Sequence, residues 1–210
     1  MGARFITIEG GEGAGKSTQA ARLARALEAA GEAVVATREP GGAPGAEAVR
    51  TLLVEGEPGR WDAMSETLLH FAARRDHLRR TVWPALAAGQ WVVCDRFTDS
   101  TVAYQGHGHG LGAETVLDMD RLATGGFRPH LTLILDLPVA AGLERAGLRQ
   151  GQETRYETMD TAFHERVRGG FRAVAEAEPE RCAVIDATRD TDAVAAAVQA
   201  AVTDHLEKVL

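Results

Sequence analysis

The sequence predicts an α/β fold in which a five-stranded parallel sheet is flanked by helices on both faces. Short apolar runs alternate with longer segments whose apolar residues recur at helical spacing, and this alternation is typical of parallel sheets covered on both sides. Charged residues follow several of the apolar runs directly, at the edge where such sheets bind ligands. The chain has 210 residues, enough for one sizeable core, and we expect a single domain over residues 1–210.

The expected elements follow in order from these patterns. Strands are expected over the apolar runs Arg4–Glu9, Ala33–Arg38, Trp91–Asp95, Leu131–Asp136 and Cys182–Asp186. Helices are expected over the alanine-rich segments Ser17–Ala30, Ala46–Val54, Ala63–Ala88, Ala113–Thr124, Val139–Leu148, Thr161–Glu178 and Thr191–Leu210. Pro84 should interrupt the longest of these, because proline has no amide hydrogen and its ring clashes with the preceding turn. The segment His107–Gly110 is expected to be a glycine-rich loop.

The composition restricts the class of protein. The net charge is −7, which argues against a general nucleic-acid binder, so we expect no nucleic-acid partner. The arginines Arg75, Arg79 and Arg80 are accordingly interpreted as a solvated helix face. No apolar run is long enough to span a bilayer and no signal peptide is recognised, so we expect a cytoplasmic protein without a membrane partner.

A glycine-rich loop follows the first predicted strand. Gly10, Gly15, Lys16 and Ser17 fit G-x-x-x-x-G-K-[ST], the motif of P-loop NTPases, and a helical pattern begins at Ser17. In this motif backbone N–H groups surround phosphate, the lysine reaches the outer phosphates and the hydroxyl binds Mg²⁺. The predicted nucleotide-binding residues are Gly10, Gly11, Glu12, Gly13, Ala14, Gly15, Lys16, Ser17 and Thr18.

Two arginines indicate a second anion site at the same edge. Arg38 and Arg96 each come directly at the end of a predicted strand, where a guanidinium can bind phosphate with two hydrogen bonds. They suggest a second phosphorylated ligand; the alternative is a pair of surface arginines matched by Glu39 and Asp95. Asparagine is absent, which excludes the N-K-x-D motif of regulatory GTPases and the catalytic-loop asparagine of protein kinases.

Four segments together resemble bacterial thymidylate kinases: EGGEGAGKS at Glu9–Ser17, TREPGG at Thr37–Gly42, DRF at Asp95–Phe97 and AYQG at Ala103–Gly106. The similarity runs in order from Phe5 to about Thr188. It implies a nucleoside-monophosphate-kinase fold, transfer of a phosphoryl group from MgATP to dTMP in dTTP biosynthesis, and a homodimer.

The resemblance also implies roles for residues at the sheet edge. Lys16 would neutralise the transferred phosphoryl, Ser17 would bind Mg²⁺, and Arg38 with Arg96 would hold the acceptor phosphate. That phosphate is already anionic, so no general base is required and positioning supplies most of the catalysis. Either Asp95 or Asp136 could help to organise Mg²⁺, and Asp95 is favoured because Arg96 follows it.

Glu12 places a carboxylate inside a loop that binds anions. The resemblance assigns a carboxylate at this place to the 3′-hydroxyl of the acceptor's deoxyribose. The alternative is a solvated carboxylate, or one that contacts Mg²⁺ through water.

The base pocket can be aligned in two ways. Thymidylate kinases stack thymine on a phenylalanine and read its carbonyl with an arginine four residues later; counting back from Pro84 places His70 and Arg74 there. A shift by one residue gives Phe71 and Arg75 instead, and the first alignment is favoured because it needs no gap. The resemblance adds further residues to this pocket, with Tyr104 favouring deoxyribose: Thr101, Tyr104, Gln105 and Arg50.

A polar, glycine-containing segment at residues 147–158 is predicted to be a short mobile lid. Positions 11–14 hold no basic residue, so the resemblance implies that Arg149 and Arg155 in the lid contact the transferring phosphoryl. Arg145 would lie behind them, near ATP. A surface loop without a chemical role is the alternative.

Three other functions fit parts of the pattern. A nucleotide-hydrolysing switch or motor would share the phosphate loop but would not need Arg38 and Arg96. A kinase of another nucleoside monophosphate would differ in the base pocket. A catalytically inactive binding protein would not need the predicted catalytic residues, which are Glu12, Lys16, Arg96, Arg149 and Arg155.

Overall fold

The computed structural model describes residues 2–57, 59–148 and 155–209, and it confirms the predicted parallel sheet with helices on both faces. Five parallel strands are ordered β2-β3-β1-β4-β5. In chain order they are β1 (Phe5–Gly10), β2 (Val34–Arg38), β3 (Trp91–Asp95), β4 (Leu131–Asp136) and β5 (Cys182–Asp186). All five predicted strands are therefore present, and the strand that leads into the phosphate loop is the central one.

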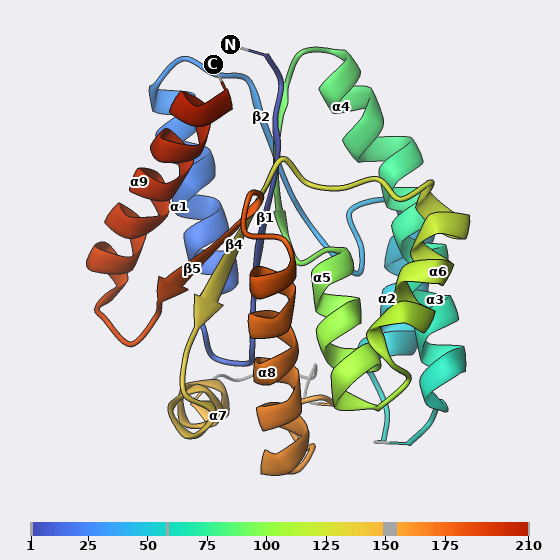
Figure 1. Ribbon diagram of the computed structural model, residues 1–210. Helices are drawn as coiled ribbons and strands as arrows, with labels where there is room; N and C mark the ends of the chain where they lie inside the picture. Colours follow the sequence, from blue (N-terminus) through green and yellow to red (C-terminus); the bar gives the residue numbers. More distant parts are fainter. Residues whose placement is uncertain (1, 58, 149–154, 210) are drawn as a thin grey trace.

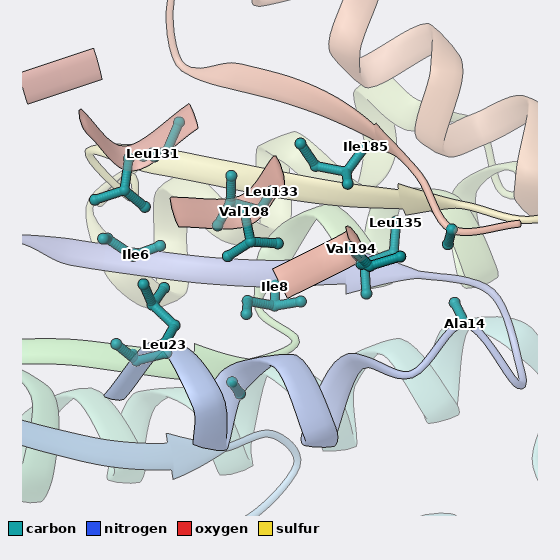
Figure 2. Packing of buried hydrophobic residues seen from close by; sticks show 14 of the residues in the cluster. Ile6, Ile8, Ala14, Leu23, Leu131, Leu133, Leu135, Ile185, Val194 and Val198 are labelled. Atoms are coloured by element: carbon teal, nitrogen blue, oxygen red, sulfur yellow. The ribbon is translucent and has the colours of Figure 1, made fainter. Parts of the chain in front are cut away.

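One face of the sheet is covered by α1 (Lys16–Ala29) and α9 (Thr191–Val209), which lie side by side in Figure 1. Ile6, Ile8 and Leu133 point from the sheet toward Leu23 of α1 and Val198 of α9 (Figure 2). Each of these five side chains is at most 2% exposed. Burial of a side chain of this size contributes roughly 1.5–3 kcal/mol, so this layer holds the base of the phosphate loop firmly.

The opposite face is covered by α8 (Thr161–Ala177). Alternation along β4 turns Ile134 away from the first layer, and it packs there with Phe163, Val167 and Phe171. Tyr104 belongs to the same cluster. The packing of α8 thereby reaches the ligand-binding edge of the sheet.

Four further helices build one flank of the molecule (Figure 1). They are α2 (Pro44–Val54), α3 (Ala63–His77), α4 (Trp83–Ala87) and α6 (Ala113–Thr124). A further helix, α7 (Val139–Gly147), follows β4. The prediction for Pro84 is confirmed, because the long helical segment is divided by a π-helical turn, η1 (Leu78–Val82), just before it.

The segment after β3 corrects the sequence interpretation. It forms α5 (Thr98–Thr101) and a π-helical segment, η2 (Val102–Gly108), so the loop expected from His107 is wrong for its first two residues. Close packing on α8 explains the helix: a Cβ at Gly170 would lie 3.0 Å from the Cα of Ala103 and 2.9 Å from the His107 ring. Tertiary contact therefore overrides the weak helical propensity of a glycine-rich stretch.

Candidate active site

A cavity of about 520 Å³ lies at the carboxyl edge of the sheet and is lined by residues from the phosphate loop, the ends of β2 and β3, and helices α3 and η2. The predicted site residues that line it are Glu12, Gly13, Gly15, Lys16, Ser17, Thr18, Arg38, Arg50, His70, Arg74, Asp95, Arg96, Thr101, Tyr104, Gln105 and Arg145. Most of the predicted residues therefore meet in one place, although they come from segments far apart in the sequence.

The phosphate loop connects β1 to α1. Gly13 has a φ of +69°, and a Cβ there would lie 2.0 Å from the carbonyl oxygen of Gly142 in α7, so only glycine fits. Gly15, with φ +89°, directly precedes the first turn of α1. Nζ of Lys16 donates to the carbonyl of Gly11 at 2.7 Å, which folds the lysine back over the loop. The loop thus presents a lysine and the positive end of a helix to one anion.

Lys16 is 8% exposed. Burial and the nearby Arg96 lower its pKa to about 8, while Glu12 and Asp95 act in the opposite direction. The lysine is thus a buried cation near a second, partly buried cation, an arrangement that an anionic ligand between them would relieve.

Ser17 and Asp95 lie together beside the loop. Oγ of Ser17 donates to Oδ2 of Asp95 at 2.5 Å, while Oδ1 of Asp95 is buried and has no hydrogen-bond partner within the described part of the chain. Asp136 differs, because Arg168 and Arg172 both donate to its carboxylate at 2.7 Å. A carboxylate oxygen without a partner beside a serine hydroxyl suits a hard divalent cation, so the geometry favours Asp95 over Asp136 for Mg²⁺.

Arg96 connects the phosphate loop to the acceptor side of the cavity. Its φ of +72° is unusual for a residue with a side chain, and such backbone strain is often found at functional sites. The guanidinium donates to the carbonyl of Gly10 at 3.2 Å, to Oε1 of Glu12 at 3.0 Å and to the hydroxyl of Tyr104 at 3.1 Å. Arg96 is therefore held on two sides, with its cationic head at the junction of the two anion sites.

Glu12 accepts a second hydrogen bond at Oε1, from the Tyr104 hydroxyl at 2.6 Å. Burial acts to raise the pKa of Glu12, but Arg96 and Lys16 outweigh it and bring the pKa to about 2. Burial raises the pKa of Tyr104, which remains a hydrogen-bond donor. Glu12 is therefore ionised and matched by cations, which explains how a carboxylate is tolerated in an anion-binding loop.

Arg38, at the end of β2, and Arg50, in α2, also line the cavity. Arg38 is half-exposed and contacts Glu47 at 3.1 Å, so the alternative in which Glu39 matches Arg38 is not what the structure shows. Glu39 instead turns into the protein and is 5% exposed. Arg50 donates to the carbonyl of Pro40 at 2.6 Å, which fixes it near the end of β2.

The base-pocket alternatives have different surroundings. His70 and Arg74 line the cavity, whereas Phe71 is 3% exposed within a hydrophobic cluster and Arg75 lies outside on the surface, over Trp83. The geometry thus favours the pair His70 and Arg74. Arg79 and Arg80 are exposed as well, in agreement with a solvated helix face.

His70 is held by a hydrogen bond of 3.1 Å between its Nε2 and the hydroxyl of Tyr156. Burial lowers the pKa of His70 to about 4, with Arg74 adding to the effect and Glu66 opposing it. The ring is therefore neutral near pH 7 and can present an uncharged aromatic face to the cavity.

Glu66 was not identified from the sequence, yet it organises this wall. It accepts hydrogen bonds from Gln105 at 2.7 Å and from Tyr156 at 2.9 Å, and it is 1% exposed. One signal was available, because Glu66 precedes His70 by four residues and so shares its helix face. Tyr156, by contrast, is brought to the cavity by a contact across 86 residues.

The predicted lid arginines are only partly accounted for. Arg149 lies outside the described residues. Arg155 is 5% exposed, pairs with Glu66 at 2.5 Å and donates to the carbonyl of Leu53, and it is not part of the cavity lining. The structure therefore does not bring Arg155 to the phosphate loop, because a buried carboxylate already binds its guanidinium. Arg145 does line the cavity and donates to the carbonyl of Ala187 at 3.1 Å.

Known proteins resemble this chain in sequence and in fold. The family model described as thymidylate kinase matches residues 8–198. A thymidylate kinase of Caulobacter vibrioides is 54% identical over 96% of this chain and 97% of its own, and one of Rhizorhabdus wittichii is 50% identical over 98% and 100%. The crystal structure of thymidylate kinase from Ehrlichia chaffeensis covers 97% of this chain and 99% of its own, with 34% identity and a TM-score of 0.78. The chain therefore belongs to the thymidylate kinase family.

Proposed function

We propose that the cavity binds MgATP at the phosphate loop and dTMP against α3 and η2, and transfers the γ-phosphoryl group of ATP to dTMP. The products are dTDP and ADP, and dTDP is the precursor of dTTP. The observation that carries this proposal is the position of Arg96, which contacts both the phosphate loop at Gly10 and the acceptor-side residues Glu12 and Tyr104.

The donor side follows from the loop. Gly10 to Thr18 would surround the phosphates with backbone N–H groups, and Lys16 would neutralise the oxygens of the transferring group. Arg145, at the cavity wall near Ala187, would contact ATP farther from the reacting phosphoryl.

The residues present fit Mg²⁺. Ser17 and Asp95 would hold it, because a hydroxyl and a carboxylate oxygen without a partner lie together there. When bound, Mg²⁺ neutralises charge on the outer phosphates. The few protein ligands suit a cation that keeps several waters and is held mainly by the nucleotide.

On the acceptor side, Arg38 and Arg96 would hold the phosphate of dTMP in line with the γ-phosphorus. An oxygen of that phosphate forms the new bond to phosphorus as the bond to the β–γ bridging oxygen breaks, and ADP leaves. The attacking oxygen is anionic, so no side chain has to remove a proton. Glu12 would accept a hydrogen bond from the 3′-hydroxyl, and Tyr104 would crowd the 2′ position.

The base would lie against the wall formed by α3 and η2. His70 would stack on it as a neutral ring, and Arg74 would donate to a base carbonyl, with Thr101, Gln105 and Arg50 at the rim. We keep Arg149 as the proposed lid residue for the transferring phosphoryl, within a single domain whose lid covers about residues 147–158. The buried pair with Glu66 argues against this role for Arg155.

We also propose a homodimer formed through α3 and α6, which lie together on one flank (Figure 1). Leu68 of α3 is 56% exposed and Leu122 of α6 is 89% exposed, and an interface through these two helices would cover both side chains. Light scattering after gel filtration should give twice the chain mass, and Leu68→Glu should give the monomer.

A cytoplasmic location is proposed from the activity, which draws on cytoplasmic nucleotides. In the three described ranges, no helix is both long and apolar enough to cross a membrane.

The proposed function is tested by measuring ADP release from MgATP with dTMP, dUMP, UMP, AMP or CMP, beside a control without acceptor. Strong dependence on dTMP is the expected result. ADP release that needs no acceptor would instead support a nucleotide-hydrolysing switch, and preference for another monophosphate would show that the base-pocket assignment is wrong.

The role of Glu12 is tested separately. Glu12→Gln should raise KM for dTMP more than KM for ATP, because the amide accepts a weaker hydrogen bond from the sugar and no longer balances Arg96. Equal increases in both KM values would contradict the sugar contact.

A further inference from the structure

We propose that Glu39 and His77 are positioning residues that hold Arg74 with one nitrogen available to the base, and that they thereby make the pocket select a keto pyrimidine over an amino pyrimidine. The inference deepens the proposed function and rests on it, since it assumes that the acceptor base lies against Arg74.

The first step is the set of contacts around the Arg74 guanidinium. Arg74 is 2% exposed, and its guanidinium lies over the rings of Phe71 and Phe97 at 4.9 and 5.0 Å. Nε donates to Oε2 of Glu39 at 2.7 Å, and Nη2 donates to the hydroxyl of Thr101 at 3.0 Å. Nη1 is buried and has no hydrogen-bond partner within the described residues, although Arg74 lines the cavity. Nη1 is therefore the nitrogen left to bind a ligand.

The second step is what holds Glu39. Its other oxygen, Oε1, lies 2.8 Å from Nδ1 of His77, and Nε2 of His77 lies 2.8 Å from the hydroxyl of Thr37. His77 is 0% exposed. A neutral imidazole satisfies both contacts, since Nδ1–H donates to the carboxylate and Nε2 accepts from the threonine hydroxyl. Thr37, His77, Glu39 and Arg74 thus form one continuous chain of hydrogen bonds.

The third step is the backbone that encloses this chain. Gly42 has a φ of +78°, and a Cβ there would lie 2.4 Å from Oγ1 of Thr37 and 2.6 Å from Nε2 of His77. The loop after β2 can close over the histidine only because position 42 is glycine. His77, Glu39 and Arg74 are therefore enclosed by the fold and shielded from water, which strengthens their hold on one another.

The fourth step connects this geometry to selectivity. An arginine donates and never accepts, so a fixed Nη1 favours a base that presents a carbonyl and leaves an exocyclic amino group without an acceptor. A site built to make a specific hydrogen bond rejects an analogue that cannot make it, because buried polar groups are then left unpaired. If Arg74 could rotate, Nη1 would lose its fixed direction and this rejection would weaken.

The test compares kcat/KM for dTMP with kcat/KM for dCMP, together with KM for ATP. Glu39→Gln keeps the side-chain size but removes the charge that holds Nε, and we expect the ratio of dTMP to dCMP to fall by about tenfold or more, mainly through KM for dTMP, with KM for ATP unchanged. Thr37 is two hydrogen bonds farther from Arg74 than Glu39 is, so we expect Thr37→Val to cause a smaller fall in the same ratio. It also serves as the test if Glu39→Gln does not fold.

A burial-matched control is Asp120→Asn. Asp120 is 0% exposed and pairs with Arg128, and it is not part of the cavity lining. This variant should lower the unfolding temperature without changing the ratio. An unchanged ratio in both Glu39→Gln and Thr37→Val, or loss of dTMP and dCMP activity in equal proportion, would overturn the positioning role. Failure of the wild-type enzyme to use dTMP is a different outcome, because it would overturn the proposed function itself.

Discussion

The two halves of the cavity are built in different ways. The donor half is formed mainly by consecutive residues from Gly10 to Thr18, apart from the side chain of Glu12, with Asp95 and Arg145 added from other segments. The acceptor half depends on side chains that meet across long stretches of sequence: Arg96 and Glu12 are 84 residues apart, and Arg74 and Glu39 are 35 residues apart. One half is mostly backbone, and the other is mostly side chains held by other side chains.

This difference predicts how each half responds to substitution. Backbone N–H groups at a helix start keep their direction whatever the neighbouring side chains are, so ATP should still bind after many single changes. In the acceptor half Arg74 and Arg96 each pair with a buried or partly buried carboxylate, and removal of one partner leaves the other without its hydrogen bonds. We expect changes there to alter acceptor use first.

The largest effect should come from Lys16→Ala. Loss of the phosphate-loop cation should lower kcat by about 10³, since a preorganised charge at the transferred group is removed. ADP release at saturating dTMP measures this, and Lys208→Ala, at the only other lysine, is the control. A loss of less than about tenfold would show that backbone groups alone carry the donor half.

Arg96→Ala should lower kcat/KM for dTMP by about 10², with KM for ATP changing by less than about threefold. The reason is that Arg96 contacts the acceptor-side pair Glu12 and Tyr104 as well as the loop carbonyl of Gly10. Arg22→Ala, at an exposed pair with Asp192, is the control. If KM for ATP rises as much as KM for dTMP, the two halves are not separable at Arg96.

Tyr104→Phe should lower kcat/KM for dTMP by about tenfold, because it removes one hydrogen bond to the ionised Glu12 and keeps the ring. The same change in a Glu12→Gln background should have a smaller effect, since the charged partner is already gone. Initial rates for the single and double variants provide the measurement. Fully additive effects would mean that Tyr104 acts on the sugar without Glu12.

The smallest effect is expected from His70→Phe, and it should appear in the pH dependence of stability. The folded-state pKa of His70, about 4, lies below its ordinary value of 6.5, so the unfolded chain binds this proton first as the pH falls. The contribution of the neutral ring is therefore present above pH 6.5 and is lost as the pH falls toward 4. Chemical denaturation should show a smaller loss of unfolding free energy between these pH values for His70→Phe than for wild type. If the unfolding free energies of the two proteins fall equally between these pH values, His70 is not held neutral.

Sequence reasoning was most successful where a structure depends on neighbouring residues. The strands, the phosphate loop and the interruption at Pro84 follow from apolar periodicity, glycine spacing and the missing proline amide, and all act within a few residues. The choice of His70 and Arg74 came from the family resemblance, by counting back from Pro84. The family resemblance added the reaction, which the comparisons confirm.

The tertiary structure alone decided which charged groups pair. Glu39 binds Arg74 and not its neighbour Arg38, Arg155 binds Glu66 and not the phosphate loop, and the glycine-rich stretch after Thr101 is helical because Gly170 lets it approach α8. Each of these outcomes depends on which side chains are buried together across dozens of residues. A buried charge must find a partner within hydrogen-bond distance, and the packing of the whole chain determines which partner that is.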